Sequence, residues 1–160
     1  MATDIDFPAQ LPCAQREGYG LQPVQTYART PMVAGRARQR RTFTNVPSMV
    51  EVSWIFTPEE AALFEAWFRD AINDGADWFN CELRTPLDGR DNPGTSLYEC
   101  RFAEGMYKGP APVGAYEWRI SAQLEIIERP LIPVGWGLFP ELVLGMSLID
   151  IAMNQEWPEA

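Results

Sequence analysis

The residues best suited to binding a charged partner lie in the stretch GRARQRR at positions 35–41, where four of seven residues are arginine. They are Arg36, Arg38, Arg40 and Arg41. An arginine side chain can donate two parallel hydrogen bonds to a phosphate or a carboxylate. A compact basic run is a common footprint of nucleic-acid binding, because bound cations release counterions from the phosphate backbone. The stretch therefore predicts a surface for an anionic partner.

The overall charge balance favours carboxylate over phosphate as that partner. The 160-residue chain has 13 Lys and Arg against 22 Asp and Glu, a net charge of −9, and outside the arginine run nine bases face those 22 acids. Dedicated duplex-binding proteins usually spread basic residues over a whole face. Screening over about 8 Å at physiological salt would still let a local basic patch act. Nucleic-acid binding therefore stays as a lower-ranked alternative.

Residues suited to catalysis or metal binding are scarce. Histidine is absent, which removes the commonest general base and the commonest metal ligand. Cys13, Cys81 and Cys100 lack C-x-x-C spacing, so they favour small buried side chains over a disulfide framework or a zinc site. Asp88 and Asp91 lie in a turn-rich loop that requires polar residues anyway. We expect a protein that is not an enzyme and binds no cofactor or metal, with a carboxylate-only hydrolase as the open alternative.

A strand and a helix that follows it directly are the best-defined elements. Residues 49–56, MVEVSWIF, place alternate apolar side chains on one face. Thr57, Pro58 and Glu60 supply an N-cap, a first-turn proline and a capping box, so a helix is expected over about residues 58–73. The predicted structural core consists of large residues from this strand, this helix and a later strand: Trp54, Phe56, Leu63, Phe64, Trp67, Phe68 and Trp118.

Further extended segments follow the helix. Residues 76–83 regain strand character, and residues 97–109 and 115–128 look like two strands joined through GPAPVG. In the last of them apolar residues alternate with polar ones from Tyr116 to Ile126, as in a half-buried antiparallel strand. Several strands around one helix predict an α+β domain that is mainly β.

The two ends of the chain differ from this central part. Residues 1–24 are rich in Pro and Gly and are expected to form an N-terminal arm, residues 25–129 the β domain, and residues 130–160 a C-terminal docking arm. The C-terminal arm has no uninterrupted span of about 20 apolar residues, so a membrane helix is not expected. We expect it to dock on another copy or another protein; packing on its own domain is the alternative. Its apolar residues at helical spacing are Leu142, Met146, Ile149 and Met153.

No secretory leader is evident, because acids occupy the positions where a leader has bases and no apolar h-region follows. A chain that stays in a reducing cytoplasm after synthesis is therefore expected.

The order of several short motifs resembles a known family. The motifs are GYGLQ at residues 18–22, a strand that enters a helix with acids in its first turn, an aromatic strand that ends in Thr-Pro, and a closing strand with a Ser-Ala-x-x-Glu core. Together they resemble the minor tail protein family of long-tailed bacteriophages, which is related in fold to distal tail and tail-tube proteins. The matching residues are Gly18, Tyr19, Gln22, Glu59, Glu60, Leu63, Phe64, Trp78, Phe79, Thr85, Pro86, Arg119, Ser121, Ala122 and Glu125.

This resemblance implies a fold and a role. The fold would be an antiparallel β-sandwich or split barrel flanked by one α-helix, with extended N- and C-terminal arms. The role would be that of a structural virion protein without catalysis, in a ring, six-fold in that family, at the tail tip or baseplate. Its partners would be the tail tube, the hub and the fibres, and DNA would pass the lumen without specific binding. The arginine run and the tail after Arg129 depart from the family pattern, so a ring of a short-tail nozzle or a head-to-tail connector is the alternative.

These expectations lead to a hypothesis for the arginine run. If residues 36–44 form a strand, Arg36, Arg38 and Arg40 point to one face. In a ring every subunit offers its surface to the next, so we expect this row to form a subunit interface or a charge ladder within the sheet. A solvated strand face without a partner ranks second, and a lumen-facing stripe that touches DNA ranks third. A host cytosolic protein-binding module is the alternative function from another class.

Overall fold

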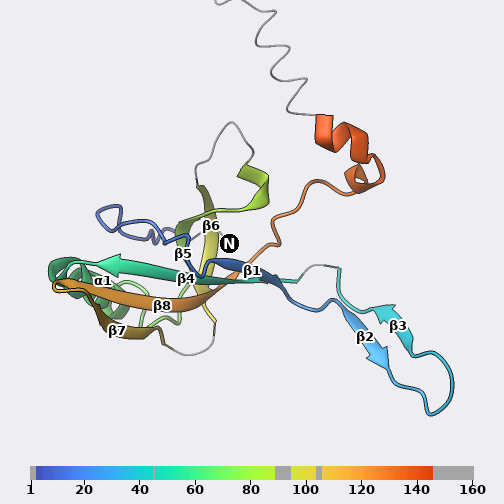
Figure 1. Ribbon diagram of the computed structural model, residues 1–160, viewed down its shortest axis with the longest axis horizontal. Coiled ribbons are helices and arrows are strands. Elements are labelled where there is room, and N and C mark those ends of the chain that lie inside the picture. Colours follow the sequence, from blue (N-terminus) through green and yellow to red (C-terminus); the bar gives the residue numbers. More distant parts are fainter. Residues whose placement is uncertain (1–2, 45, 89–94, 104–105, 146–160) are drawn as a thin grey trace, which may run out of the picture. The chain divides into compact units, whose positions relative to one another are not determined.

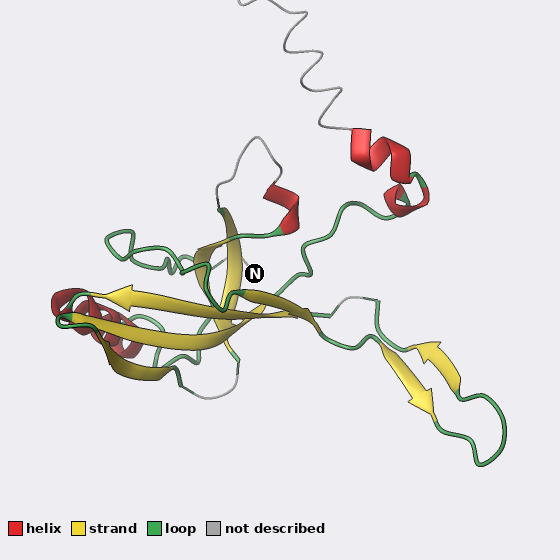
Figure 2. Ribbon diagram, in the orientation of Figure 1, coloured by secondary structure: helices red, strands yellow, loops and turns green. Residues whose placement is uncertain are grey.

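The structure is a computed structural model that describes residues 3–44, 46–88, 95–103 and 106–145. Antiparallel strands dominate these residues, together with one main helix, which confirms the expected α+β, mainly β fold (Figure 2). In chain order the elements are β1 (Gly20–Pro23), β2 (Tyr27–Thr30), β3 (Arg38–Arg41), β4 (Ser48–Phe56), α1 (Pro58–Asp70), β5 (Phe79–Leu83), the 3₁₀ turn η1 (Pro86–Asp88), β6 (Ser96–Phe102), β7 (Lys108–Val113), β8 (Glu117–Ile126) and the 3₁₀ turn η2 (Trp136–Leu138).

Six of the strands form one antiparallel sheet in the order β1, β4, β8, β6, β5, with β7 also paired to β8. The central pair runs from Ser48 opposite Ile126 to Phe56 opposite Trp118. Because β4 occupies one edge of β8, β6 and β7 share the other edge, β6 near the end of β8 and β7 near its start. In Figure 1 β5 and β6 run across the direction of β4 and β8, so the sheet turns sharply between β8 and β6.

The GPAPVG stretch was expected to be a connection, and this expectation is wrong. Its first five residues belong to β7, which pairs with β8 from Val113 opposite Glu117 to Lys108 opposite Ser121, with a register shift between Lys108 and Ala111. Proline lacks the N–H that a strand needs toward a neighbour, so it is normally restricted to sheet edges. β7 pairs with β8 alone among the described strands, and such an edge position tolerates both prolines.

The core lies between one face of this sheet and α1. Val50, Val52, Trp54 and Phe56 are all buried, as their two-residue period predicts. The sheet side also includes Ile120, Leu124 and Ile126 of β8, and α1 contributes Ala61, Phe64 and Phe68. Burying a large apolar side chain stabilises a fold by roughly 1.5–3 kcal/mol, so this apolar core is the main stabilising feature of the domain.

The start of α1 follows the predicted capping box. The backbone N–H of Glu60 donates to the Thr57 hydroxyl at 3.3 Å, and the Glu60 carboxylate accepts from the Thr57 N–H at 2.8 Å. The helix ends at Asp70, earlier than the expected residue 73, because Asn73 and Asp74 adopt positive φ angles of 51° and 56° that a right-handed helix does not allow.

Leu63 was expected in the core, and this expectation is wrong because its side chain is 42% exposed. Consecutive helix residues are turned by about 100°, so Leu63 lies well round the helix from its neighbour Phe64. The buried stripe of α1 is narrow and consists of Ala61, Phe64 and Phe68. Trp67 and Trp118 are half-buried and pack against the core cluster rather than lying within it.

The N-terminal segment lies against its own domain. The Phe7 ring stacks on Trp54 at 5.7 Å between centroids, and Leu11 is buried. The Phe7 N–H donates to the Asn80 carbonyl at 2.8 Å, and the Asn80 N–H donates to the Ile5 carbonyl at 2.8 Å. These contacts cover the outer edge of β5, which would otherwise present unpaired backbone groups.

The chain divides into two compact units. Unit 1 comprises residues 1–83 and 96–129, and unit 2 comprises residues 84–95 and 130–160. Within the described part of unit 2, η1 and η2 are followed by a helical stretch at residues 140–145.

Replacing Gly75 with alanine is expected to destabilise the domain more than the same change at Gly114. Both glycines have positive φ angles, 87° and 64°, where a side chain costs about 1–2 kcal/mol. At Gly75 the new Cβ would also lie 2.9 Å from Cζ of the buried Phe68, whereas nothing lies within 4 Å at Gly114. This overlap should add about 1–3 kcal/mol. Urea denaturation measures both losses, and equal losses would contradict the packing of Gly75 on Phe68.

Candidate protein interface

Three of the arginines singled out in the sequence, Arg38, Arg40 and Arg41, lie in a separate two-stranded sheet formed by β2 and β3, and Arg36 lies in the loop between these strands (Figure 1). We call residues 24–44 the arginine hairpin. It contains five arginines and no Asp or Glu, although the whole chain carries a net charge of −9. Almost every residue of the hairpin is exposed. A cationic element with a charge of +5 therefore extends from a protein whose other residues sum to −14.

The register of the hairpin determines which arginines share a face. Arg40 lies opposite Ala28 and Arg38 opposite Thr30. Residues directly opposite in an antiparallel pair share a face, so Arg38 and Arg40 stand on one face beside two small side chains. β3 begins at Arg38, and Arg36 therefore lies outside the strand that was expected to hold it.

Arg41 lies on the opposite face of the hairpin, and its side chain binds the backbone directly after β3. The Arg41 side chain donates to the Phe43 carbonyl and to the Thr44 carbonyl, both at 2.9 Å. These hydrogen bonds fix the Arg41 guanidinium near the backbone. Arg38 and Arg40 are thus the pair best placed to receive carboxylates from outside the hairpin.

A charge ladder within the sheet was one form of the arginine hypothesis, and this form is wrong. The residues opposite Arg38 and Arg40 carry no charge, and the hairpin contains no carboxylate. Among the described residues the ion pairs join Arg69 to Asp70, Arg101 to Glu125 and Arg119 to Glu17, and none includes an arginine of the hairpin. The subunit-interface form of the hypothesis stays a prediction.

Exposed apolar side chains accompany these cations. Tyr27, Met32, Val33 and Phe43 are all between about half and fully exposed. Met32 and Val33 lie between the two strands, at the hairpin tip, and Gly35 there has a φ of 95°, which suits a chain reversal. Arginine, tyrosine, methionine and phenylalanine are the residue types enriched at protein interfaces. The composition of the hairpin is therefore that of a protein-binding surface.

The C-terminal segment in unit 2 also exposes apolar side chains. Leu142, one of the predicted interface residues, is 47% exposed, and Leu138, Phe139 and Leu144 near it are more exposed still. Met146, Ile149 and Met153 lie outside the described residues. An apolar segment of this kind is suited to burial against another surface.

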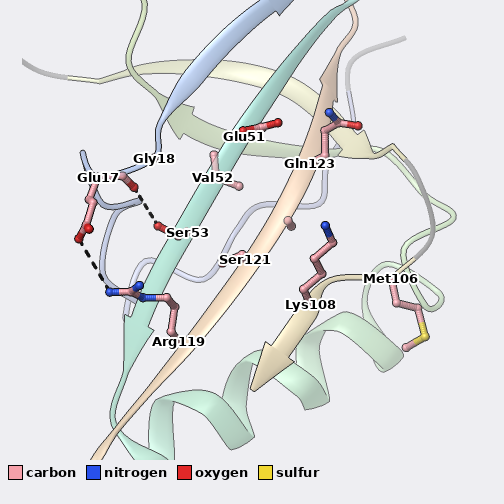
Figure 3. A pocket seen from close by; sticks show the side chains of 11 residues that line it. Glu17, Gly18, Glu51, Val52, Ser53, Met106, Lys108, Arg119, Ser121 and Gln123 are labelled. Atoms are coloured by element: carbon pink, nitrogen blue, oxygen red, sulfur yellow. Dashed lines mark hydrogen bonds and ion pairs between the residues drawn. The ribbon is translucent and has the colours of Figure 1, made fainter. Parts of the chain in front are cut away.

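A shallow hollow of about 490 Å³ lies on the face of the β4–β8 pair opposite the aromatic core (Figure 3). Its lining carries charges of both signs, from Glu17, Glu51, Lys108 and Arg119. Arg119 is 3.8 Å from the Glu17 carboxylate, and the Ser53 hydroxyl donates to the Glu17 carbonyl at 3.3 Å. These contacts hold residue 17 against the sheet, and the hollow offers hydrogen-bonding groups without a dominant charge.

The cysteines occupy two kinds of environment. Cys81 and Cys100 are buried free thiols on β5 and β6, and Cys13 is exposed. A hydrogen bond with Cys81 and burial raise the pKa of the Cys100 thiol far above its usual range, so it stays neutral and unreactive. Within residues 3–44, 46–88, 95–103 and 106–145, no three His, Cys, Asp or Glu side chains are grouped as a metal site would require.

Comparison with known proteins found no matching family model, no matching curated protein and no matching solved structure. In the described part of the chain, no helix has the length and apolar character needed to cross a bilayer.

Sequence reasoning identified the arginines but missed two features of the surface. The first is the apolar tip of the hairpin, for which the signal was the PMVA stretch at residues 31–34 directly before the arginine run. The second is the exposed side of α1, where Leu63 lies. The signal for it was weak, because the apolar residues of the helix cover more of its circumference than one sheet contact can bury.

Proposed function

We propose that this chain is a structural protein of a bacteriophage tail, which forms a ring at the tail tip or baseplate and joins the tail tube to neighbouring tail proteins. In this role the protein needs no cofactor and performs no catalysis. The observation that carries the proposal is the arginine hairpin, which combines five exposed cations and an exposed apolar tip with no carboxylate of its own.

The charge distribution supports association between copies. A +5 hairpin on a body of charge −14 makes each copy complementary to the next, whereas two hairpins or two bodies repel each other. A contact between unlike surfaces is heterologous, and heterologous contacts close into rings when the rotation between copies divides a full turn. The mainly β fold with one helix and the motif order that resembles minor tail proteins support placing this ring in a phage tail.

The exposed C-terminal segment supports contact with further proteins of the tail. Its exposed apolar side chains include Leu138, Phe139, Leu142 and Leu144. Glu141 is the only charged residue among the described residues 130–145. Such a segment fits an apolar groove on the tube, the hub or an adjoining copy.

Electron microscopy of the purified full-length protein tests the proposal. We expect rings with one predominant number of copies, formed at low salt and high protein concentration. The same preparation mixed with duplex DNA should show weak binding that does not depend on sequence. Single particles of 18.1 kDa mass at every concentration would contradict the proposal. Tight DNA binding with a steep salt dependence would instead assign the hairpin to nucleic acid.

A further inference from the structure

The exposed side of α1 carries a surface whose chemistry complements the arginine hairpin. Glu59, Leu63, Ala66 and Asp70 are all exposed. They occupy positions i, i+4, i+7 and i+11 of the helix, so they lie in one narrow stripe about 16 Å long. We call these four residues the α1 stripe. Two apolar side chains lie at its centre and one carboxylate lies at each end.

This stripe lies away from the core. The stripe that faces the sheet consists of Ala61, Phe64 and Phe68, and the position of Leu63 round the helix places it outside that contact. With 42% of its side chain exposed, Leu63 keeps apolar surface that its own domain does not cover. It is available to another molecule.

The charge around the α1 stripe is the opposite of the hairpin's charge. Helix α1 itself contains four acids and one base, and that base, Arg69, binds Asp70 with its Nε 2.7 Å from Oδ1. A hydrogen bond from Arg69 lowers the pKa of Asp70, so its carboxylate stays ionised at neutral pH. Glu65, on another side of the helix, already accepts a hydrogen bond from the Tyr107 hydroxyl at 3.2 Å. The acids of the α1 stripe are Glu59, which belongs to no ion pair among the described residues, and Asp70, whose two carboxylate oxygens already accept from Arg69 at 2.7 and 3.0 Å.

We infer that the α1 stripe of one copy is the acceptor surface for the arginine hairpin of a second copy. Leu63 and Ala66 receive exposed apolar side chains of the hairpin, Glu59 receives one of its arginines, and Asp70 shares its carboxylate between Arg69 and a second hairpin arginine. Charge complementarity assigns this occupant, because the +5 hairpin is the strongest cationic element in the sequence and helix α1 carries a net charge of −3. The inference rests on the proposed self-association and adds the surface at which it occurs.

A heterologous contact has two separable halves, and this allows a sharp test. Leu63→Arg places a cation in the middle of the stripe and leaves the hairpin of the same copy intact. The double variant Arg38→Glu with Arg40→Glu damages the hairpin and leaves the stripe intact. Each variant alone should remain monomeric. When the two are mixed, the intact hairpin of the first should bind the intact stripe of the second, and the complex should stop at one copy of each.

Sedimentation velocity of each variant and of the mixture gives the result. Native protein should form larger assemblies, each variant alone should sediment as a monomer, and the mixture should form a 1:1 dimer. Leu97→Arg, which changes another exposed leucine on β6, is the matched control and should assemble like the native protein. Circular dichroism should show the native fold in all variants, because every changed side chain is exposed.

The outcomes separate this inference from the proposed function. If native protein assembles and Leu63→Arg assembles equally well, the hairpin binds elsewhere and the α1 stripe is not its acceptor. If the mixture stays monomeric while both variants are folded, the two surfaces do not bind each other and the inference is wrong. If the native protein itself does not associate, the proposed function fails together with the inference.

Discussion

Replacing Phe64 with alanine should destabilise the domain by about 3–5 kcal/mol, the range for large aromatic truncations in cores. Phe64 has no exposed surface, and its ring contacts six other aromatic rings: Phe7, Trp54, Phe56, Trp67, Phe68 and Tyr107. The substitution would remove the residue through which the N-terminal segment, the sheet and α1 meet. Since single domains are stable by about 5–15 kcal/mol in total, a large fraction of the stability would be lost.

The adjacent residue provides the control for this prediction. Leu63→Ala changes the preceding residue of the same helix but removes an exposed side chain. The free energy of unfolding should therefore fall by no more than about 0.5 kcal/mol. Urea unfolding followed by tryptophan fluorescence measures both variants. Similar losses for Phe64→Ala and Leu63→Ala would show that α1 does not face the sheet as described.

Reversing two charges of the hairpin, Arg38→Glu with Arg40→Glu, should weaken self-association at least tenfold and leave the fold intact. Both side chains are exposed and stand together on the hairpin face beside Ala28 and Thr30. Reversal replaces attraction to a neighbour's carboxylates with repulsion, and like charges in an interface cost several kcal/mol. Light scattering as a function of concentration measures the change.

A control with the same net charge distinguishes this contact from general repulsion. Arg16→Glu with Arg129→Glu alters the total charge equally, and both arginines are exposed outside the hairpin. This second double variant should assemble as the native protein does. Equal weakening by the two double variants would mean that total charge, and not the hairpin surface, governs association.

Local rules predicted the parts of the fold that depend on neighbouring residues. The two-residue period identified the buried face of β4, and Thr57 with Glu60 identified the start of α1 through the capping box. Strand β7 was missed because the prolines of GPAPVG suggested a loop, and their tolerance in β7 depends on its position at an edge of the sheet. Edge position is a property of the tertiary structure that local sequence does not contain.

The candidate interface was predictable in its charge but not in its form. The run from Arg36 to Arg41 was evident, and the absence of acids between residues 18 and 50 was available in the same sequence. The pairing of β3 with β2 depends on register, and it places Thr30 and Ala28, rather than carboxylates, opposite Arg38 and Arg40. Leu63 was assigned to the core because periodicity identifies an apolar stripe but not how wide a stripe the sheet covers.

Sedimentation equilibrium of the native full-length chain tests most directly whether the hairpin joins copies of this protein. The account predicts a mass that rises from one copy to a fixed multiple with increasing protein concentration, and an association that weakens at high salt because the hairpin contacts are ionic. A mass of 18.1 kDa at all concentrations, at low and at high salt, would contradict it.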